Sequence, residues 1–155
     1  MQFTAPAALV KLGVNLWPPF VGAGISVRHI APDFREVYVE MELGLRNRGY
    51  FGTHFGGSLY AMTDPFFALM VLRNLGSGYR VWDQAASIEF VAPGRGTVHA
   101  RFALTERDLT QIRRATEDGE KHLHLFKVEV RDEHKLVVAR VEKVVYVRRK
   151  RSKPA

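Results

Sequence analysis

Asp64 is the first candidate for chemistry, because it is the only charged residue between His54 and Arg73. Its apolar neighbours predict a buried helix, where a carboxylate costs free energy unless it is paired, hydrogen-bonded or protonated. Burial raises the pKa of a carboxyl group, and carboxyls perturbed in this way are common at functional sites. A second interpretation stays open because Pro65 follows. An Asp-Pro pair is a good N-cap and first helical position, so Asp64 would then only start a second helical segment after a kink.

Two glycines, Gly56 and Gly57, stand where this helix begins. Free amides at a helix start can stabilise a developing oxyanion, and glycines let a substrate carbonyl approach the backbone closely. The glycines could equally serve only to allow a tight entry into the helix. Asp64 follows Gly56 by eight residues, which is about 12 Å along a helix axis at ~1.5 Å per residue. One carbonyl cannot touch both within one chain, so the catalytic interpretation requires a dimer with its site at the interface.

Other reactive groups are absent or incomplete. The chain has no cysteine, which excludes disulfides, thiolate metal sites and thiol nucleophiles. His122 and His124 share one face of a predicted strand, but no third metal ligand is evident, and we interpret them as surface or packing histidines. Residues 56–59 do not form a serine-hydrolase elbow, and residues 49–57 lack the ending of a phosphate loop. We therefore predict no metal and no cofactor.

The helix that carries these residues is predicted over 58–75 and is apolar on nearly every face, so other structure must surround it. A polar helix is predicted over 105–119, with Thr105 as its cap and Asp108 at its third position. A short amphipathic helix over 5–16 is expected to end at Trp17-Pro18-Pro19. The remaining pattern predicts strands over 23–30, 36–43, 81–91, 97–104, 123–130 and 136–148.

The order of these elements indicates an α+β fold. Tight turns at 93–96 and 132–134 join consecutive strands, which favours an antiparallel sheet. A curved sheet wrapped around the central helix would bury that helix. The length of 155 residues fits one domain, over residues 1–148, followed by a basic tail over 149–155.

Composition and charge narrow the function classes. With 46% hydrophobic and 25% charged residues the chain is typical of packed proteins. No stretch reaches the ~18–20 apolar residues of a membrane span, and no signal-peptide pattern opens the chain, so we expect a cytoplasmic protein. Most of the net charge of +7 lies from Arg140 onward. Such a tail could contact nucleic acid or anionic ligands. We favour a solvated end, because the chain lacks an aromatic platform or second basic patch.

A glycine-punctuated segment resembles a known family. Asn47 is followed by Gly52-Thr53-His54-Phe55-Gly56-Gly57-Ser58-Leu59-Tyr60-Ala61-Met62-Thr63-Asp64. This stretch resembles hot-dog-fold thioesterases of the phenylacetate-pathway type, in which an Asn precedes a His-Gly-Gly helix start and an Asp follows eight residues after the first Gly. Three further motifs resemble a sub-branch known mainly as a domain of unknown function: Val81-Trp82-Asp83, Ile88-Glu89-Phe90 and Pro93-Gly94-Arg95. The resemblance spans roughly residues 15–148.

The resemblance implies a hot-dog fold and the hydrolysis of an acyl-CoA or related hydrophobic acyl thioester by a homodimer, often paired into a tetramer. Asp64 would be the nucleophile or general base. The amides of Gly56 and Gly57 would hold the thioester oxygen, and Asn47 would help to position water or substrate. A thioester is an activated acyl group, so a desolvated carboxylate and two amides can suffice without a metal.

One position departs from the family pattern: Phe55 precedes Gly56, and the histidine lies one place earlier, at His54. His54 could point into the site or be a partly exposed loop histidine. Asp83 could pair with a basic residue or face the cavity. The nucleotide phosphates would meet Arg95 or the tail. The acyl chain would lie among Phe55, Leu59, Phe66 and Phe67. The alternative function is a non-catalytic hot-dog module that binds acyl-CoA or a lipid-like ligand, with Asp64 as a helix cap.

Overall fold

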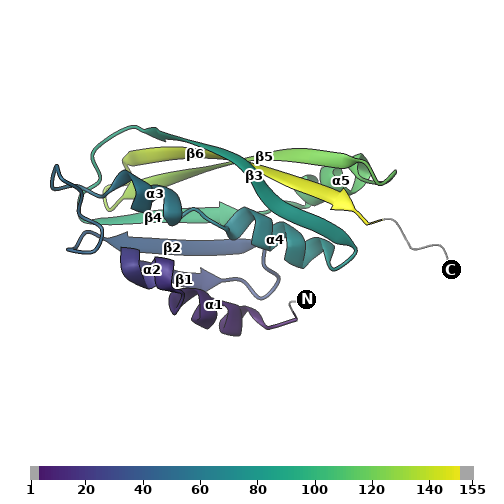
Figure 1. The fold of residues 1–155 in the computed structure, drawn as a ribbon, viewed down its shortest axis with the longest axis horizontal. Helices are drawn as coiled ribbons and strands as arrows, with labels where there is room; N and C mark the ends of the chain where they lie inside the picture. Colours follow the sequence, from purple (N-terminus) through teal and green to yellow (C-terminus); the bar gives the residue numbers. More distant parts are fainter. Residues whose placement is uncertain (1–3, 151–155) are drawn as a thin grey trace.

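The computed structural model describes residues 4–150. One six-stranded antiparallel sheet runs through it, with helices α3 and α4 lying across its front (Figure 1). The strands follow one another in space in the order β1-β2-β4-β5-β6-β3. This arrangement confirms the expected α+β fold, a curved antiparallel sheet around a central helix. The strands are β1 (Ile25–Ile30), β2 (Glu36–Glu42), β3 (Tyr79–Phe90), β4 (Thr97–Ala103), β5 (Lys121–Asp132) and β6 (Val137–Arg149).

The core lies between the sheet and the central helix. In β2 the predicted alternation is realised, because Val37, Val39 and Met41 are fully buried. From the helix side Phe67 stacks on Phe126 of β5, with the ring centroids 4.4 Å apart, and makes an edge contact with Phe102 of β4. Aromatic pairs of this kind add packing energy beyond their buried area. The sheet and the helix therefore hold each other in place.

The central helix is broken in the middle. It forms α3 (Gly56–Ala61) and α4 (Phe66–Leu75), with residues 62–65 between them. A single helix over 58–75 is therefore wrong, because Pro65 has no amide hydrogen to bond back and its ring collides with the preceding turn. The residue at the N-cap position of α4 is Pro65, and no side chain caps this helix. The alternative of a second helical segment after a kink is confirmed, but Asp64 does not cap that segment.

The prolines near the start of the chain begin a helix. The predicted first helix is present as α1 (Ala7–Asn15), but Pro18 and Pro19 open a second helix, α2 (Pro18–Ala23). Proline is favoured in a first helical turn because its missing amide hydrogen would have no partner there. Gly24, with φ of 71°, ends α2 and leads the chain into β1.

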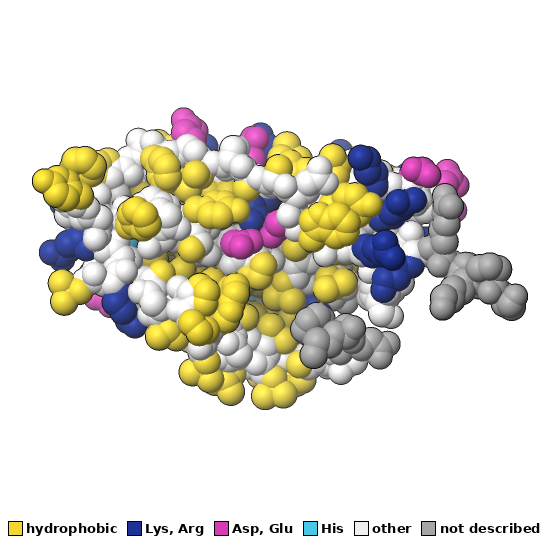
Figure 2. Space-filling view, in the orientation of Figure 1, with side chains coloured by type: hydrophobic (Ala, Val, Ile, Leu, Met, Phe, Trp, Pro, Cys, Tyr) yellow, Lys and Arg dark blue, Asp and Glu magenta, His cyan; other side chains and the backbone are white. Residues whose placement is uncertain are grey.

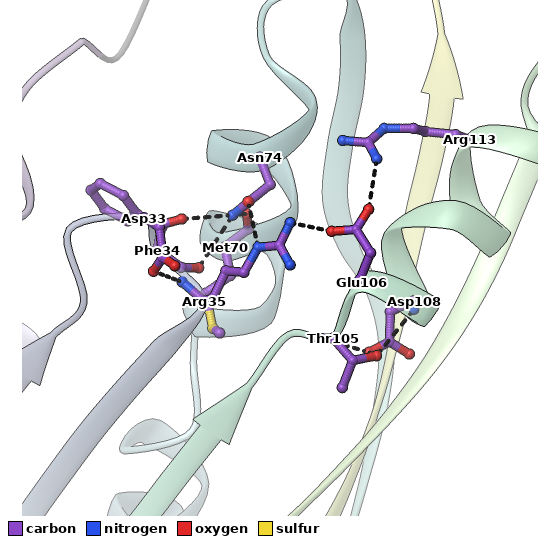
Figure 3. A network of polar contacts seen from close by, with 9 residues as sticks. All are labelled: Asp33, Phe34, Arg35, Met70, Asn74, Thr105, Glu106, Asp108 and Arg113. Carbon is purple, nitrogen blue, oxygen red and sulfur yellow. Dashed lines mark hydrogen bonds and ion pairs between the residues drawn. The ribbon is translucent and has the colours of Figure 1, made fainter.

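Polar contacts tie the far end of α4 to its neighbours (Figure 3). The Asn74 amide donates to the carbonyl oxygens of Met70, Asp33 and Phe34, which joins α4 to the turn between β1 and β2. Arg35 at that turn donates to Glu106 at the start of α5 (Glu106–Ala115). These contacts connect three elements that are remote in the sequence.

β3 lies at the outer edge of the sheet, beyond β6, so it is not a neighbour of β4. The prediction that residues 93–96 form a tight turn between adjacent strands is therefore wrong. Residues 91–96 are a crossing link held by the backbone: the His54 amide donates to Gly94 O at 3.0 Å, and the Leu43 amide donates to Gly96 O at 3.0 Å. This link runs past the start of α3.

The basic carboxy-terminal residues belong largely to the sheet. β6 continues to Arg149, one residue into the predicted tail, and includes Arg140, Lys143 and Arg148. Arg151 and Lys153 lie outside the described residues. Within the described part of the chain, no helix is long and apolar enough to cross a membrane.

Candidate functional site

Asp64 lies in the link between α3 and α4 and contacts a lysine from the sheet. Lys143 Nζ donates to Asp64 Oδ1 at 2.9 Å. The Asp64 side chain keeps 42% of its surface exposed, whereas Lys143 is fully buried. The break in the central helix thus presents a carboxylate to solvent on one side and to a buried ammonium on the other.

Lys143 has three polar partners from three different elements. Besides Asp64, its ammonium lies 3.3 Å from Asp83 Oδ2 on β3 and donates to the Tyr60 hydroxyl on α3 at 3.2 Å. Asp83 is 20% exposed, and its other oxygen, Oδ1, is buried without a hydrogen-bond partner. We call Tyr60, Asp64, Asp83 and Lys143 the Asp64 cluster. Figure 2 shows this face of the molecule, where acidic side chains meet a basic one among hydrophobic side chains.

The two carboxyl groups of the cluster differ in their proton affinity. Burial, together with a hydrogen bond to Asp64, raises the pKa of Asp83 to about 6. Burial would also raise the pKa of Asp64, but hydrogen bonds with Asp83 and Lys143 outweigh it and leave that pKa below its ordinary value. Burial would lower the pKa of Lys143, yet its bonds to Asp64, Asp83 and Tyr60 hold it above the ordinary value. The cluster therefore keeps a charged lysine beside two unequal carboxyls.

A separate cavity of about 590 Å³ opens beside the start of α3. We call it the Gly56 cavity. Exposed Arg95 stands at this cavity, and Leu59 supplies a buried apolar wall. Its lining residues are Phe51, Thr53, His54, Gly56, Leu59, Phe90, Val91, Ala92, Pro93, Gly94 and Arg95. Three of the predicted site residues besides Gly56, namely His54, Leu59 and Arg95, are thus brought together.

His54 is a buried histidine of the Gly56 cavity. Only 5% of its surface is exposed, so the interpretation as a partly exposed loop histidine is wrong. Its Nε2 lies 2.9 Å from Gly96 O, and its Nδ1 has no hydrogen-bond partner among the described residues. Burial lowers the pKa of His54, and the hydrogen bond to Gly96 only partly opposes this. The imidazole is therefore neutral at neutral pH and leaves one ring nitrogen unused.

Aromatic rings lie against both glycines at the start of α3. A methyl group added at Gly56 would come within 2.9 Å of the Phe90 ring, and one added at Gly57 within 2.5 Å of the Phe55 ring. Among the hydrogen bonds of residues 4–150, neither glycine amide donates one. The rings of Phe55 and Phe90 are more than half exposed.

Four predicted site residues lie elsewhere. Phe66 and Phe67 are buried in the core, Phe55 is exposed, and none of the three lines the Gly56 cavity, which leaves Leu59 as the predicted acyl contact that does. Asn47 is buried, and its side chain bonds only backbone groups: it donates to Ala23 O and Glu42 O and accepts from the Gly44 amide. Asn47 thus braces the segment before α3 and is not brought to Asp64.

The Gly56 cavity and the Asp64 cluster are separate in one chain, because Asp64 does not line the cavity. One strand runs past both, since β3 carries Asp83 in the cluster and Phe90 at the cavity. Within the described sheet, β3 pairs only with β6, so its other edge is open along the strand. Residues 84–87 of β3 are small or polar and exposed at this edge.

His122 and His124 take part in a chain of hydrogen bonds. His122 Nε2 lies 3.1 Å from His124 Nδ1, and His124 Nε2 lies 3.2 Å from Asp108 Oδ1 at the start of α5. His124 is buried, so this chain joins β5 to α5. The described residues contain no group of three ligands that could hold a metal ion.

Sequence reasoning missed Lys143 and Tyr60 as members of the site. A signal for Lys143 was present, because Val141, Lys143, Val145 and Val147 alternate along β6 and the other three are core residues. A lysine at such an inward position needs a buried partner. Tyr60 carried no signal of its own, since an aromatic residue in an apolar helix is ordinary.

Comparisons with known proteins add a family and a fold. The model of the family described as Domain of unknown function (DUF4442) matches residues 6–147. No curated protein matches the sequence. A Pseudomonas aeruginosa protein of unknown function, described as a probable thioesterase, is similar in structure, with a TM-score of 0.82 at 15% identity over 97% of this chain and 100% of that one.

Two further solved structures are similar. One is a thioesterase from Haemophilus influenzae, with a TM-score of 0.68 at 15% identity over 96% of this chain and 94% of that one. The other is a mutant thioesterase from Pseudomonas aeruginosa, with a TM-score of 0.69 at 11% identity over 95% of this chain and 96% of that one. At such identities the similarity shows the fold, and it confirms the hot-dog architecture.

Proposed function

We propose, from the premise that this chain belongs to the DUF4442 family, that it hydrolyses an acyl-CoA or related hydrophobic acyl thioester. The family description names no reaction, so support has to come from the fold and the site. The fold is shared with structures described as thioesterases. The site offers a carboxylate, exposed on one side, in the broken central helix.

The observation that carries the proposal is the ion pair between Asp64 and the buried Lys143. A lysine ammonium at 2.9 Å keeps the Asp64 carboxylate ionised, while the exposed side of the carboxylate remains free to receive substrate and water. An ionised carboxylate can take a proton from water or attack an activated acyl carbon directly. Thioesters need no stronger activation, so the described residues suffice without a metal.

The Gly56 cavity supports the choice of substrate class. Its wall is largely apolar, with Leu59 and Phe90, which suits an acyl chain. Arg95 adds a positive charge at this cavity, where it could meet a phosphate. The unused amides of Gly56 and Gly57 begin α3 beside this cavity and could hold the thioester oxygen.

A homodimer would bring the two regions together. The open edge of β3 can pair with the same strand of a second copy, which would extend the sheet across both chains. Because β3 runs past both the Asp64 cluster and the Gly56 cavity, this pairing would place the carboxylate of one protomer near the cavity of its partner. A site at this interface would let one thioester contact both the Asp64 cluster and the Gly56 cavity, which are separate within one chain.

The first test is hydrolysis of short, medium, long and aryl acyl-CoAs by the wild type and by Asp64→Asn. The substitution keeps the side-chain shape and removes the negative charge. We expect kcat/KM for the best substrate to fall by about 10² or more, the usual effect of losing a general base. The matched control is Asp118→Asn, an exposed aspartate in the turn after α5.

Three outcomes of this experiment separate the functions. Loss of activity in Asp64→Asn alone, with folding and oligomeric mass unchanged, would support hydrolysis at Asp64. Equal activity of all three proteins would move the chemistry elsewhere. No turnover by the wild type, together with a raised melting temperature in the presence of the same acyl-CoAs, would favour a module that binds the ligand without hydrolysing it.

A further inference from the structure

We propose that Asp83 is a second catalytic carboxyl, that it acts with Asp64 as one acid–base pair, and that Lys143 is the residue that positions this pair. The proposal rests on the thioester hydrolysis proposed above. It assigns a role to two residues, on β3 and β6, that lie far in the sequence from the link carrying Asp64.

The geometry brings three charged groups to one place. Lys143 Nζ lies 2.9 Å from Asp64 Oδ1 and 3.3 Å from Asp83 Oδ2, so one ammonium serves two carboxyls. The carboxyls also lie close enough to each other to form a hydrogen bond when one of them is protonated. Two carboxyls around one buried cation cannot both be fully compensated, so they bind one proton more readily than either would alone.

The buried oxygen of Asp83 points to the same arrangement. Asp83 Oδ1 has no hydrogen-bond partner in the described part of the molecule, which is costly for an ionised carboxylate. A proton shared with Asp64 reduces that cost, because a neutral carboxyl group is far less penalised by burial. This agrees with a pKa of about 6 for Asp83, raised by burial and by Asp64.

Among residues 4–150, the ion-pair partner of Asp83 is Lys143. Tyr60 on α3 and Lys143 on β6 are the remaining titratable residues of the cluster, and the lysine bonds the tyrosine hydroxyl. α4 also packs against β3, but its only titratable residue, Arg73, lies over the Phe34 ring and donates to Ala5 O. Burial and Asp64 raise the proton affinity of Asp83, and the charge of Lys143 opposes them.

The reaction balances with this pair alone. The oxygen of a water attacks the thioester carbon while one proton of that water passes to the carboxyl pair. The tetrahedral intermediate then collapses, the carbon–sulfur bond breaks, and the leaving sulfur takes the proton back from the pair. The products are a carboxylic acid and a thiol. Lys143 stays protonated throughout. A base with a pKa near the working pH is better suited to this exchange than an ordinary aspartate.

The test is the pH dependence of kcat/KM for the wild type, Asp83→Asn and Lys143→Met. In the wild type we expect activity to fall below about pH 6, where the pair takes up its proton. In Asp83→Asn the pH below which kcat/KM decreases should be lower by about one unit or more, because Asp64 is then the only carboxylate paired with Lys143. In Lys143→Met that pH should be higher, with activity recovering in alkaline buffer. Lys127→Met, at an exposed ion pair with Glu142 of β6, is the control.

A structural role for these residues would give different results. If Asp83 served only to bury Lys143, Asp83→Asn would lower activity equally at every pH and leave the position of the fall unchanged. That result would overturn the proposal. Far-ultraviolet circular dichroism checks that Lys143→Met is folded. If it is not, Asp83→Asn decides, because it should shift the pH at which activity falls to lower values.

A second measurement separates this inference from the proposed function. Carbon-13 NMR of labelled aspartates follows the carboxyl groups of Asp64 and Asp83 directly, without a substrate. We expect both signals to respond to the same two protonation steps, and Asp64→Asn to lower the pKa of Asp83. Coupled titration without turnover of any thioester would defeat the proposed reaction and not the pair. Turnover with an independent, ordinary titration of Asp83 would defeat the pair.

Discussion

Lys143 occupies a position in β6 that the pattern of the strand reserves for core residues such as Val141 and Val145. A buried ammonium is tolerated only with compensating charge and hydrogen bonds, and here it has two carboxyls and a tyrosine hydroxyl. Removing one carboxyl leaves the other in place. Single substitutions at Asp64 or Asp83 should therefore preserve the fold, which makes them usable as functional tests.

Another buried group, His54, should make the stability of the protein depend on pH. Burial lowers the pKa of His54 from 6.5, so below this pH the unfolded chain binds a proton that the folded protein does not. The free energy of unfolding therefore falls as the pH drops below about 6.5, by at most ~1.4 kcal/mol per pH unit for one proton. We expect a flatter dependence in His54→Gln, measured by urea unfolding between about pH 7 and 5.

The control for this prediction is His134→Gln, at an exposed turn between β5 and β6. This variant should keep the pH dependence of the wild type. An identical slope in His54→Gln and the wild type would contradict the prediction, because it would mean that His54 titrates alike in the folded and the unfolded protein.

At the scale of the element, helix ends decide where the site lies. Pro65 interrupts the central helix and leaves Asp64 in a link where its carboxylate can reach the sheet. A continuous helix would have kept residue 64 in the hydrogen-bonded interior of the helix. The N-terminus of α5 follows the sequence prediction, because Thr105 and Asp108 form the expected capping box.

The capping box of α5 yields a prediction on stability. Thr105 Oγ1 accepts from the Asp108 amide at 3.1 Å, and Asp108 Oδ2 accepts from the Thr105 amide at 2.9 Å. Thr105→Ala removes the first bond and should lower the free energy of unfolding by about 1 kcal/mol, measured by denaturant titration. Thr110→Ala, on the exposed face of the same helix, should leave it unchanged or slightly raised. Equal effects of the two variants would contradict a capping role.

At the scale of the whole molecule, the strand order places the site at an edge. β3 is the last strand of the sheet and pairs with β6, which sets Asp83 opposite Val145 and next to Lys143. An edge strand of 12 residues has unpaired backbone N–H and C=O groups that can pair with another chain, unless charged residues or prolines prevent this. Residues 84–87 of this strand carry neither charges nor proline.

Dimerisation through β3 can be tested by charge. The double variant Ala85→Glu with Ser87→Glu would bring like charges together across a paired β3 edge, which destabilises the pairing. We expect the wild type to have about twice the chain mass of 17.6 kDa in light scattering, and the variant to approach one chain mass. Its kcat/KM should fall with the loss of the dimer.

The matched control places the same two charges on α5, as Thr110→Glu with Gln111→Glu, where both side chains are exposed. This control should keep the dimer mass and the activity. A wild type that is monomeric and fully active would contradict a shared site. It would mean that one chain brings the thioester to Asp64 without the cavity of a partner.

Local patterns were enough to predict most elements of the fold. The alternation of apolar and polar residues predicted β2, and the all-round apolar stretch predicted a central helix. The Thr105 capping box predicted the start of α5. Each of these patterns depends on neighbours within a few residues. Asp64, Gly56, His54 and Arg95 could be singled out for the same reason. The functions of Pro18 and Pro65 were harder to predict, since a proline can end one helix or begin another.

The sequence by itself determined that a carboxylate stands in an otherwise apolar stretch, that α+β elements surround it, and that eight residues separate it from Gly56. Only the tertiary structure decided what that carboxylate contacts. Lys143 and Asp83 lie 79 and 19 residues after Asp64 in the sequence. They meet it because β3 crosses to the far side of β6. The choice of strand neighbours depends on packing across the whole sheet, which no local pattern records.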